Sequence, residues 1–169
     1  LGDVYKRQLL DSKKINADEK IRLTTLSIGA IIPDKFMELA EKNENCYAFY
    51  PHSIYQKYGV HLDEIKMDEW YDKLAQDDEI EKKEINPREL LTRIAQTQQE
   101  SGYPYVVFID SANQQHTLKD VGMIKMSNLC CEIFQYQTPS DIKGYGQVSD
   151  WGQDISCNLG SLNLSLIHI

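Results

Sequence analysis

The fold is indicated most clearly by a helix that leads straight into a strand, in the stretch NPRELLTRIAQTQQESGYPYVVFI at residues 86–109. Asn86 can cap this helix, Pro87 suits its first position, and Gly102 can end it. The apolar stripe at helical spacing consists of Leu90, Leu91, Ile94 and Ala95. Residues 105–109 are β-branched and aromatic, which predicts a strand. A helix joined to a strand in this way predicts an α/β fold within one domain.

Shorter elements are predicted on the N-terminal side of this stretch. Residues 16–20 begin like a short helix. Residues 26–32 form an apolar run stopped by Pro33, which predicts a buried strand. Asp34 is then expected to cap a helix. The apolar side of that helix consists of Phe36, Met37, Leu39 and Ala40.

A second helix is predicted over residues 51–58, ending at Gly59. Residues 62–84 are highly charged, so only a few of their side chains are expected to be buried. Those expected buried side chains are Ile65, Trp70, Leu74 and Ile80.

The C-terminal part is predicted to contain less regular structure. Residues 110–119 are polar and predict a loop or a short helix before a strand that contains Cys130. Residues 138–152 are rich in turn formers, and their Gly-Tyr-Gly at 144–146 lacks the strand and helix that a phosphate-binding loop requires. We interpret 144–146 as a turn. A helix is predicted over residues 157–163.

The run Asn128-Leu129-Cys130-Cys131-Glu132 carries the most informative chemistry of the chain. If it is a strand, Asn128, Cys130 and Glu132 lie on one face, because alternate side chains of a strand point the same way. An amide, a thiol and a carboxylate on one face can hold a polar substrate, act on it through sulfur and move a proton. Cys131 then points to the opposite face, and Cys157 can reach the site only if the fold brings it there. The pattern favours a radical or redox site over a hydrolytic one.

Each of these residues also has a purely structural interpretation. Cysteine is among the most buried residue types, so Cys46 and Cys131 are interpreted as structural, and Cys157 taken alone would be too. The residues alone leave Cys130 evenly divided between core and catalyst. Glu132 favours function, because a carboxylate near a buried strand needs a partner or a role. The surface histidines are expected to be His52, His61 and His116.

Composition limits the classes of function. The 169 residues include 18 basic and 26 acidic ones, a net charge of −8, which argues against nonspecific nucleic-acid binding. No apolar run approaches the ~20 residues that span a bilayer, so no membrane partner is expected. The four cysteines form neither a CxxC pair nor a Cys/His cluster, so no metal site is predicted. This cysteine usage favours a reducing, cytoplasmic location.

The two ends of the chain are related to each other through DNA. Residues 3–8 can be encoded by GAT GTG TAT AAG AGA CAG, and the reverse complement of that DNA encodes residues 164–169. We therefore expect residues 1–8 and 164–169 to derive from a sequencing adapter and exclude them from fold reasoning. The natural part is expected to be an internal fragment, residues 9–163.

Four motifs resemble one enzyme family. The sequence Met-Ser-Asn-Leu-Cys-Cys-Glu-Ile at 126–133 resembles the active-site finger of the large subunit of aerobic ribonucleotide reductase. Residues 154–163 are similar to the redox-cysteine segment of the class Ib branch, and residues 16–22 and 100–105 also resemble that branch. The motifs occur in the family's order, and the resemblance covers residues 9–163.

The resemblance implies a fold and a reaction. The chain would form part of a ten-stranded α/β barrel with a finger loop inside it, in an enzyme that reduces ribonucleoside diphosphates to deoxyribonucleotides. By position, Cys130 matches the cysteine that becomes a thiyl radical and takes hydrogen from the ribose 3′ carbon. Glu132 matches the carboxylate that accepts the 3′-hydroxyl proton, and Asn128 matches the amide that holds the substrate hydroxyls. Cys157 matches one of the two cysteines that reduce the 2′ position and end as a disulfide.

The resemblance also implies partners. The family relies on a small subunit with a dimetal (manganese or iron) tyrosyl radical, on nucleotide effectors, on a homodimer of large subunits, and on a thioredoxin- or glutaredoxin-like reductant. No cofactor is expected in this chain itself. The second redox cysteine lies upstream in the family, so we expect the isolated chain to lack reductase activity.

Two alternatives stay open at this stage. One is another thiyl-radical reductase class, such as a cobalamin-dependent or glycyl-radical enzyme, against which the class Ib-like segments argue. The other is a noncatalytic nucleotide-binding relative, which would lack the second redox cysteine or the radical-transfer tyrosines of the family.

Overall fold

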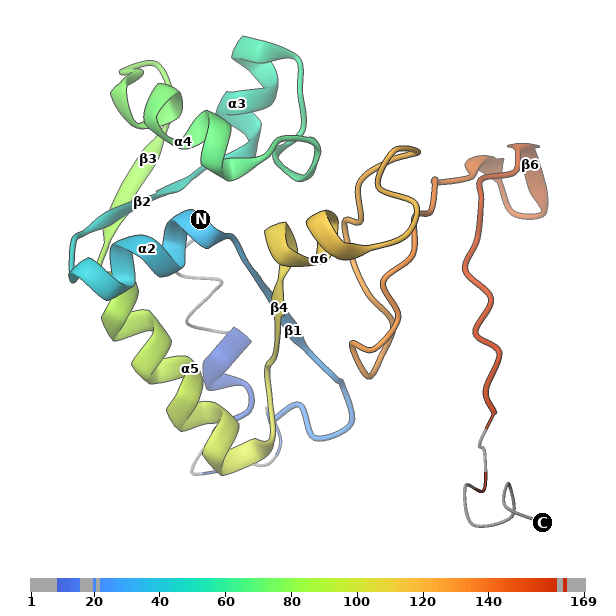
Figure 1. Ribbon diagram of the computed structural model, residues 1–169, viewed down its shortest axis with the longest axis horizontal. Coiled ribbons are helices and arrows are strands. Elements are labelled where there is room, and N and C mark those ends of the chain that lie inside the picture. The colour runs from blue at the N-terminus through green and yellow to red at the C-terminus, as the bar shows by residue number, and fades with distance from the viewer. Residues whose placement is uncertain (1–8, 16–19, 21, 161–162, 164–169) are drawn as a thin grey trace.

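A computed structural model describes residues 9–15, 20, 22–160 and 163, and Figure 1 shows its course. The elements follow one another as β1 (Gly29–Ile32), α2 (Asp34–Lys42), β2 (Cys46–Phe49), α3 (Pro51–Tyr58), the 3-10 helix η1 (Leu62–Glu64), α4 (Met67–Gln76), β3 (Lys82–Ile85), α5 (Pro87–Ser101), β4 (Tyr105–Phe108), α6 (Ile109–Gln115), β5 (Asp141–Gly144) and β6 (Gln147–Asp150). Among the described residues, no helix is long and apolar enough to cross a membrane.

Strands β1 and β4 form a parallel pair, with Gly29 opposite Tyr105 and Ile32 opposite Phe108. Parallel neighbours require a long crossover, and here the crossover contains α2 and α5. Both helices lie beside the pair in Figure 1. The core that joins the strands to these helices consists of Leu10, Ile32 and Ile94, with Phe36, Met37, Leu90, Leu91 and Val106 packed around them.

A separate lobe is inserted into this crossover, between α2 and α5 (green in Figure 1). Its strands β2 and β3 are antiparallel, and α3, η1 and α4 lie between them in sequence. Leu74 and Ile80 are buried in its core beside Phe49 and Ile54, and Ile65 and Trp70 pack against that core. The predicted buried contacts of the charged stretch are therefore confirmed.

One carboxylate, that of Asp77, ties α3 to the chain that follows α4. Its oxygens accept hydrogen bonds from Lys57 Nζ at 2.7 Å, Tyr58 Oη at 2.5 Å and the Glu79 N–H at 3.0 Å. The Lys57 hydrogen bond, and next that of Tyr58, lower the pKa of Asp77 from 3.8 to about 2. The ionised form of Asp77 is therefore part of what holds the lobe together.

We expect Asp77→Asn to loosen the lobe at neutral pH. Because the folded pKa lies below the unfolded one, the stabilisation is complete above pH 3.8 and disappears as the pH falls through about 2. Amide hydrogen exchange in α3 and α4 of the complete subunit should be faster in the variant at pH 7, and the difference should shrink as the pH falls. Asp78→Asn, at an exposed neighbouring position, is the matched control. A pH-independent difference would contradict this account.

The predicted start and end of the long helix α5 are confirmed by its capping residues. Asn86 Oδ1 accepts the Glu89 N–H at 3.0 Å, and Gly102 ends the helix with a φ of 77°. One member of the predicted stripe is wrong, because Ala95 is exposed and Thr97 is buried instead. Thr97 can be buried because its hydroxyl donates to the Arg93 carbonyl at 2.9 Å.

Three boundaries differ from the sequence predictions. The predicted strand 26–32 is shorter, since β1 begins at Gly29. Asp34 does not cap α2; Pro33 occupies the cap position, and carboxylates from elsewhere in the chain bind the first N–H groups. Strand β4 ends at Phe108, where α6 begins without a loop. Helix α3, in contrast, has the predicted bounds and ends at Gly59.

The C-terminal part of the chain is the least regular. Strands β5 and β6 form a hairpin around the turn at Tyr145 and Gly146, where Gly146 has a φ of 72°. The interpretation of 144–146 as a turn is confirmed. The predicted helix 157–163 is wrong for its described residues 157–160 and 163, which have no regular structure. Most of the predicted helix 16–20 lies outside the described residues, as do both end segments.

Candidate active site

The run from Asn128 to Glu132 is a tight turn, and the predicted strand is wrong. The Cys131 N–H donates to the Asn128 carbonyl at 3.0 Å, which places Leu129 and Cys130 at the corner of the turn. Cys131 follows in the left-handed region, with a φ of 59°. The side chains of this segment therefore do not alternate between two faces as they would in a strand. The hydrogen bonds of the turn determine where they point.

The Asn128 side chain explains why the chain turns here. Its Oδ1 accepts the main-chain N–H groups of Glu132 at 3.1 Å and Ile133 at 3.0 Å. Ser127 Oγ also donates to the Ile133 carbonyl at 2.7 Å. Local side-chain bonds of this kind satisfy groups that a strand would pair with a neighbouring strand. Among the described contacts, Asn128 Nδ2 donates no hydrogen bond, so the amide keeps a donor for a ligand.

The turn separates its two thiols. Cys130 and Glu132 are exposed, whereas Cys131 is half-buried. A Cβ placed on Gly29 would lie 3.6 Å from Cys131 Sγ, so this thiol packs at the start of β1. The two cysteines therefore have different surroundings, although they do not lie on opposite faces of a strand. Cys131 faces the protein, and Cys130 faces outward at the corner of the turn.

The electrostatics of the turn agree with this placement. Burial raises the pKa of the Cys131 thiol, and electrostatic interactions with Glu132 and Cys130 raise it further. The pKa of Tyr105 is also raised, first by a hydrogen bond with Tyr103 and to a smaller extent by the nearby thiols. Since Tyr105 pairs with Gly29 in the sheet, the turn lies over the beginning of the parallel strands.

Cys157 is exposed and is not brought to the turn in the described part of the chain. Residues 151–160 have no regular structure, and Figure 1 shows this C-terminal segment extending away from the helices. The predicted redox role of Cys157 therefore stays a prediction.

The remaining sequence candidates have structural surroundings. Cys46 is 4% exposed in β2, which agrees with its interpretation as a core residue. His52 and His61 are exposed, and the His61 ring stacks on Tyr55. His116 is only half exposed, and its Nε2 is buried with no hydrogen-bond partner among the described residues. Its prediction as a surface histidine is therefore only partly correct.

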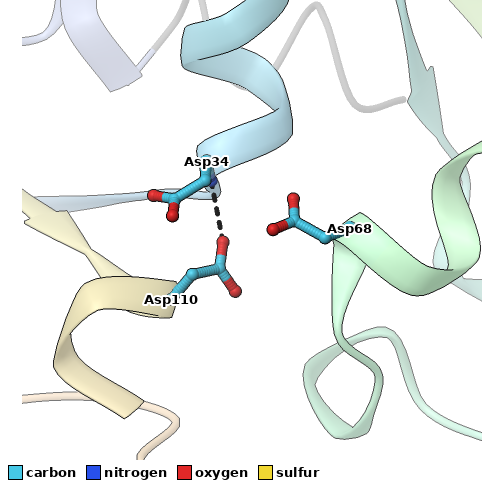
Figure 2. Close-up of side chains that lie close together, drawn as sticks. All are labelled: Asp34, Asp68 and Asp110. Carbon is cyan, nitrogen blue, oxygen red and sulfur yellow. Dashed lines mark hydrogen bonds between the residues drawn. The ribbon is translucent and has the colours of Figure 1, made fainter. Parts of the chain in front are cut away.

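Sequence reasoning missed a group of three carboxylates, shown in Figure 2. Oxygens of Asp34, Asp68 and Asp110 lie within 4.8 Å of one another, as in a cation site. Asp110 accepts the Asp34 N–H at 2.7 Å, and Asp68 accepts the Lys35 N–H at 3.0 Å. These bonds satisfy free N–H groups in the first turn of α2, which accounts for the positions of the Asp68 and Asp110 carboxylates. The three residues are far apart in sequence, so no local pattern signals them.

Comparison with known proteins identifies the family. Residues 3–168 match the family "Ribonucleotide reductase, barrel domain". The chain belongs to this family. It is 50% identical over 155 residues to the ribonucleoside-diphosphate reductase subunit alpha of Bacillus subtilis (strain 168), covering 92% of this chain and 22% of that protein. The corresponding subunit of Mycoplasma genitalium is 45% identical over 158 residues, covering 94% of this chain and 22% of that protein.

More distant members of the ribonucleotide reductase family also match. The large subunit from Plasmodium falciparum (isolate Dd2) is 29% identical over 166 residues, covering 96% of this chain and 18% of that protein. The chain thus spans about a fifth of the length of each of these three relatives. Membership of the reductase family agrees with the resemblance seen in the motifs.

Proposed function

We propose that this chain is the part of a class Ib ribonucleoside-diphosphate reductase α subunit that carries the radical cysteine. One observation carries the proposal: a member of the reductase family presents an exposed thiol, Cys130, at the corner of a turn built by Asn128, and the exposed Glu132 follows two residues later. The complete protein would reduce ribonucleoside diphosphates to 2′-deoxyribonucleoside diphosphates for DNA synthesis.

The proposed architecture is a ten-stranded α/β barrel, of which β1 and β4 are two neighbouring strands. Parallel strands are normally covered on both faces, yet Ile31 is 50% exposed and Phe108 46% exposed. An apolar hollow of about 390 Å³ beside β1, β2 and α2 is lined by residues such as Phe36, Phe49 and Met67. Such uncovered apolar surface supports a larger structure around the pair.

Cys130 is proposed as the hydrogen-abstracting group. As a thiyl radical, its sulfur takes the hydrogen atom from the ribose 3′ carbon, which leaves a carbon radical and the Cys130 thiol. After reduction at the 2′ position, the thiol returns a hydrogen atom to the 3′ carbon. The exposed position of Cys130 at the corner of the turn supports this role, because a substrate can reach its sulfur.

Glu132 and Asn128 are proposed to act on the hydroxyl groups. Loss of the 2′-hydroxyl as water is easier when a base removes the 3′-hydroxyl proton, and the exposed Glu132 carboxylate is suited to accept it. Asn128 Oδ1 is used by the turn itself, so its Nδ2 is the group proposed to hold a substrate hydroxyl oxygen. The same amide would thus shape the site and orient the substrate.

Cys157 is proposed as one half of the dithiol that reduces the 2′ position. Two thiols supply two electrons and two protons and become a disulfide, which an external dithiol reductant must then reduce. The second cysteine would come from another part of the complete subunit. Since Cys157 lies in an extended segment, its approach to Cys130 would depend on the rest of the barrel.

The proposed partners follow from the same assignment. They are a small subunit with a dimetal tyrosyl radical, which supplies the oxidising equivalent, a second large subunit, nucleotide effectors and a thioredoxin- or glutaredoxin-like reductant in the cytoplasm. The dimetal tyrosyl radical is proposed to lie in the small subunit, as the resemblance to the family implies.

The test is an assay of the complete subunit, obtained from the full open reading frame. Mixed with its small subunit, a ribonucleoside diphosphate and a dithiol, it should form the deoxyribonucleotide, and the reading frame should contain a second redox cysteine upstream. A folded subunit that binds the nucleotides without forming product would favour the noncatalytic alternative.

A further inference from the structure

Asn113, in α6, holds the main chain of Ile124 from both sides. Its Oδ1 accepts the Ile124 N–H at 2.7 Å, and its Nδ2 donates to the Ile124 carbonyl at 3.1 Å. The same Nδ2 also donates to the Ile109 carbonyl at 3.0 Å, within its own helix. One side chain therefore fastens the chain that leads to the active-site turn onto α6, as a neighbouring strand would.

The fastened residue is a rigid point on the way to Cys130. The Ile124 side chain is 1% exposed, so both its backbone and its side chain are fixed. The next residues are held less firmly: Met126 is 56% exposed, and the Lys125 ion pairs with Asp63 and Glu64 lie at the surface. Surface pairs of this kind contribute about 0–1 kcal/mol. We call residues 116–127, which connect α6 to the turn, the arm. The Asn113 hydrogen bonds constrain this arm more strongly than the Lys125 ion pairs do.

We propose that Asn113 is a positioning residue for Cys130, an inference that rests on the proposed function. Asn113 fixes the main chain at Ile124 against α6, and Asn128, four residues further on, closes the turn. Together the two amides define the place of the Cys130 sulfur relative to β1 and β4. Asn113 itself need not touch the substrate.

The chemistry explains why an amide is needed at position 113. The side chain must accept from one N–H group and donate to two carbonyl oxygens at the same time. A carboxylate of the same size keeps the acceptor but places a negative oxygen against those carbonyls. Asn113→Asp should therefore release the Ile124 carbonyl and shift the arm. A misplacement of about 1 Å at a reacting atom can reduce a rate about 100-fold.

The experiment uses the complete holoenzyme with Asn113→Asp, and Gln114→Glu as the control. The control makes the same amide-to-carboxylate change at an exposed position of α6. We expect Asn113→Asp to lower kcat about 10- to 100-fold with little change in KM, and Gln114→Glu to behave as the wild type. With a 3′-deuterated substrate, the isotope effect should increase in Asn113→Asp, because hydrogen transfer then limits the rate.

Several results would overturn the proposal. One is an Asn113→Asp enzyme with unchanged kcat and isotope effect; another is a lower folded fraction with unchanged kcat per folded subunit. If Asn113→Asp does not fold, Asn113→Ser, which replaces the amide with an uncharged hydroxyl group, is measured by the same criteria. Cys130→Ser separates the two claims. If Cys130→Ser is inactive while Asn113→Asp has normal kinetics, only the positioning role of Asn113 fails. If Cys130→Ser is active, the proposed function fails.

Discussion

Cys130→Ser in the complete reductase should reduce turnover to background while nucleotide binding persists. A sulfur radical exchanges hydrogen with a sugar carbon at little thermodynamic cost, whereas the oxygen of serine would have to form a far less stable radical. The substitution is nearly isosteric, and Cys130 is exposed, so the fold should tolerate it. Formation of deoxyribonucleotide and equilibrium binding of substrate are the two measurements.

The neighbouring thiol supplies the matched control for this result. Cys131→Ser makes the same chemical change one residue away, at a half-buried position that faces Gly29. It should retain most of the activity, because Cys131 does not face the substrate in the proposed site. If Cys130→Ser is active and Cys131→Ser is not, the radical assignment belongs to the other cysteine.

Glu132→Gln should lower kcat by a factor of about 10² to 10⁴, the usual contribution of a general base. Glutamine keeps the size of the side chain and leaves the main-chain bond from residue 132 to Asn128 intact. The loss should therefore appear in kcat rather than in the KM for the ribonucleoside diphosphate. Steady-state kinetics with the complete holoenzyme measure both quantities.

Glu41→Gln is a suitable control for the loss of one negative charge, because Glu41 is exposed on α2. Its kinetics should match those of the wild type. A Glu132→Gln enzyme with normal kcat would remove Glu132 from the proposed proton transfer. Equal losses in both variants would indicate an effect of net charge instead.

Local chemistry allowed much of the fold to be predicted. The residues that begin and end helix α5 can be identified in its own sequence. Asn86 caps its start and Gly102 ends it, as expected. The burial of Leu74 and Ile80 could also be predicted, because they are apolar residues in a charged stretch. Where the structure depends on hydrogen bonds between neighbouring residues or on short apolar patterns, sequence reasoning is effective.

The residues of the candidate site stay a prediction from the sequence, whereas the predicted shape of their segment is wrong. Alternation suggested a strand from Asn128 to Glu132, yet the Asn128 amide binds two N–H groups ahead of it and forms a turn. Asn113 and the Asp34–Asp68–Asp110 cluster were not foreseen, because their partners are distant in sequence or belong to the backbone. Cys157 is exposed in a segment without regular structure, so its redox role stays a prediction.

The most direct test of the central claim is reductase activity in a chimera. Residues 9–163 of this chain would replace the matching segment of the Bacillus subtilis α subunit, to which the chain is 50% identical. With the B. subtilis small subunit, the chimera should form deoxyribonucleotide, and the same chimera with Cys130→Ser should form none. A folded chimera that binds substrate but makes no product, or an active Cys130→Ser chimera, would contradict the account.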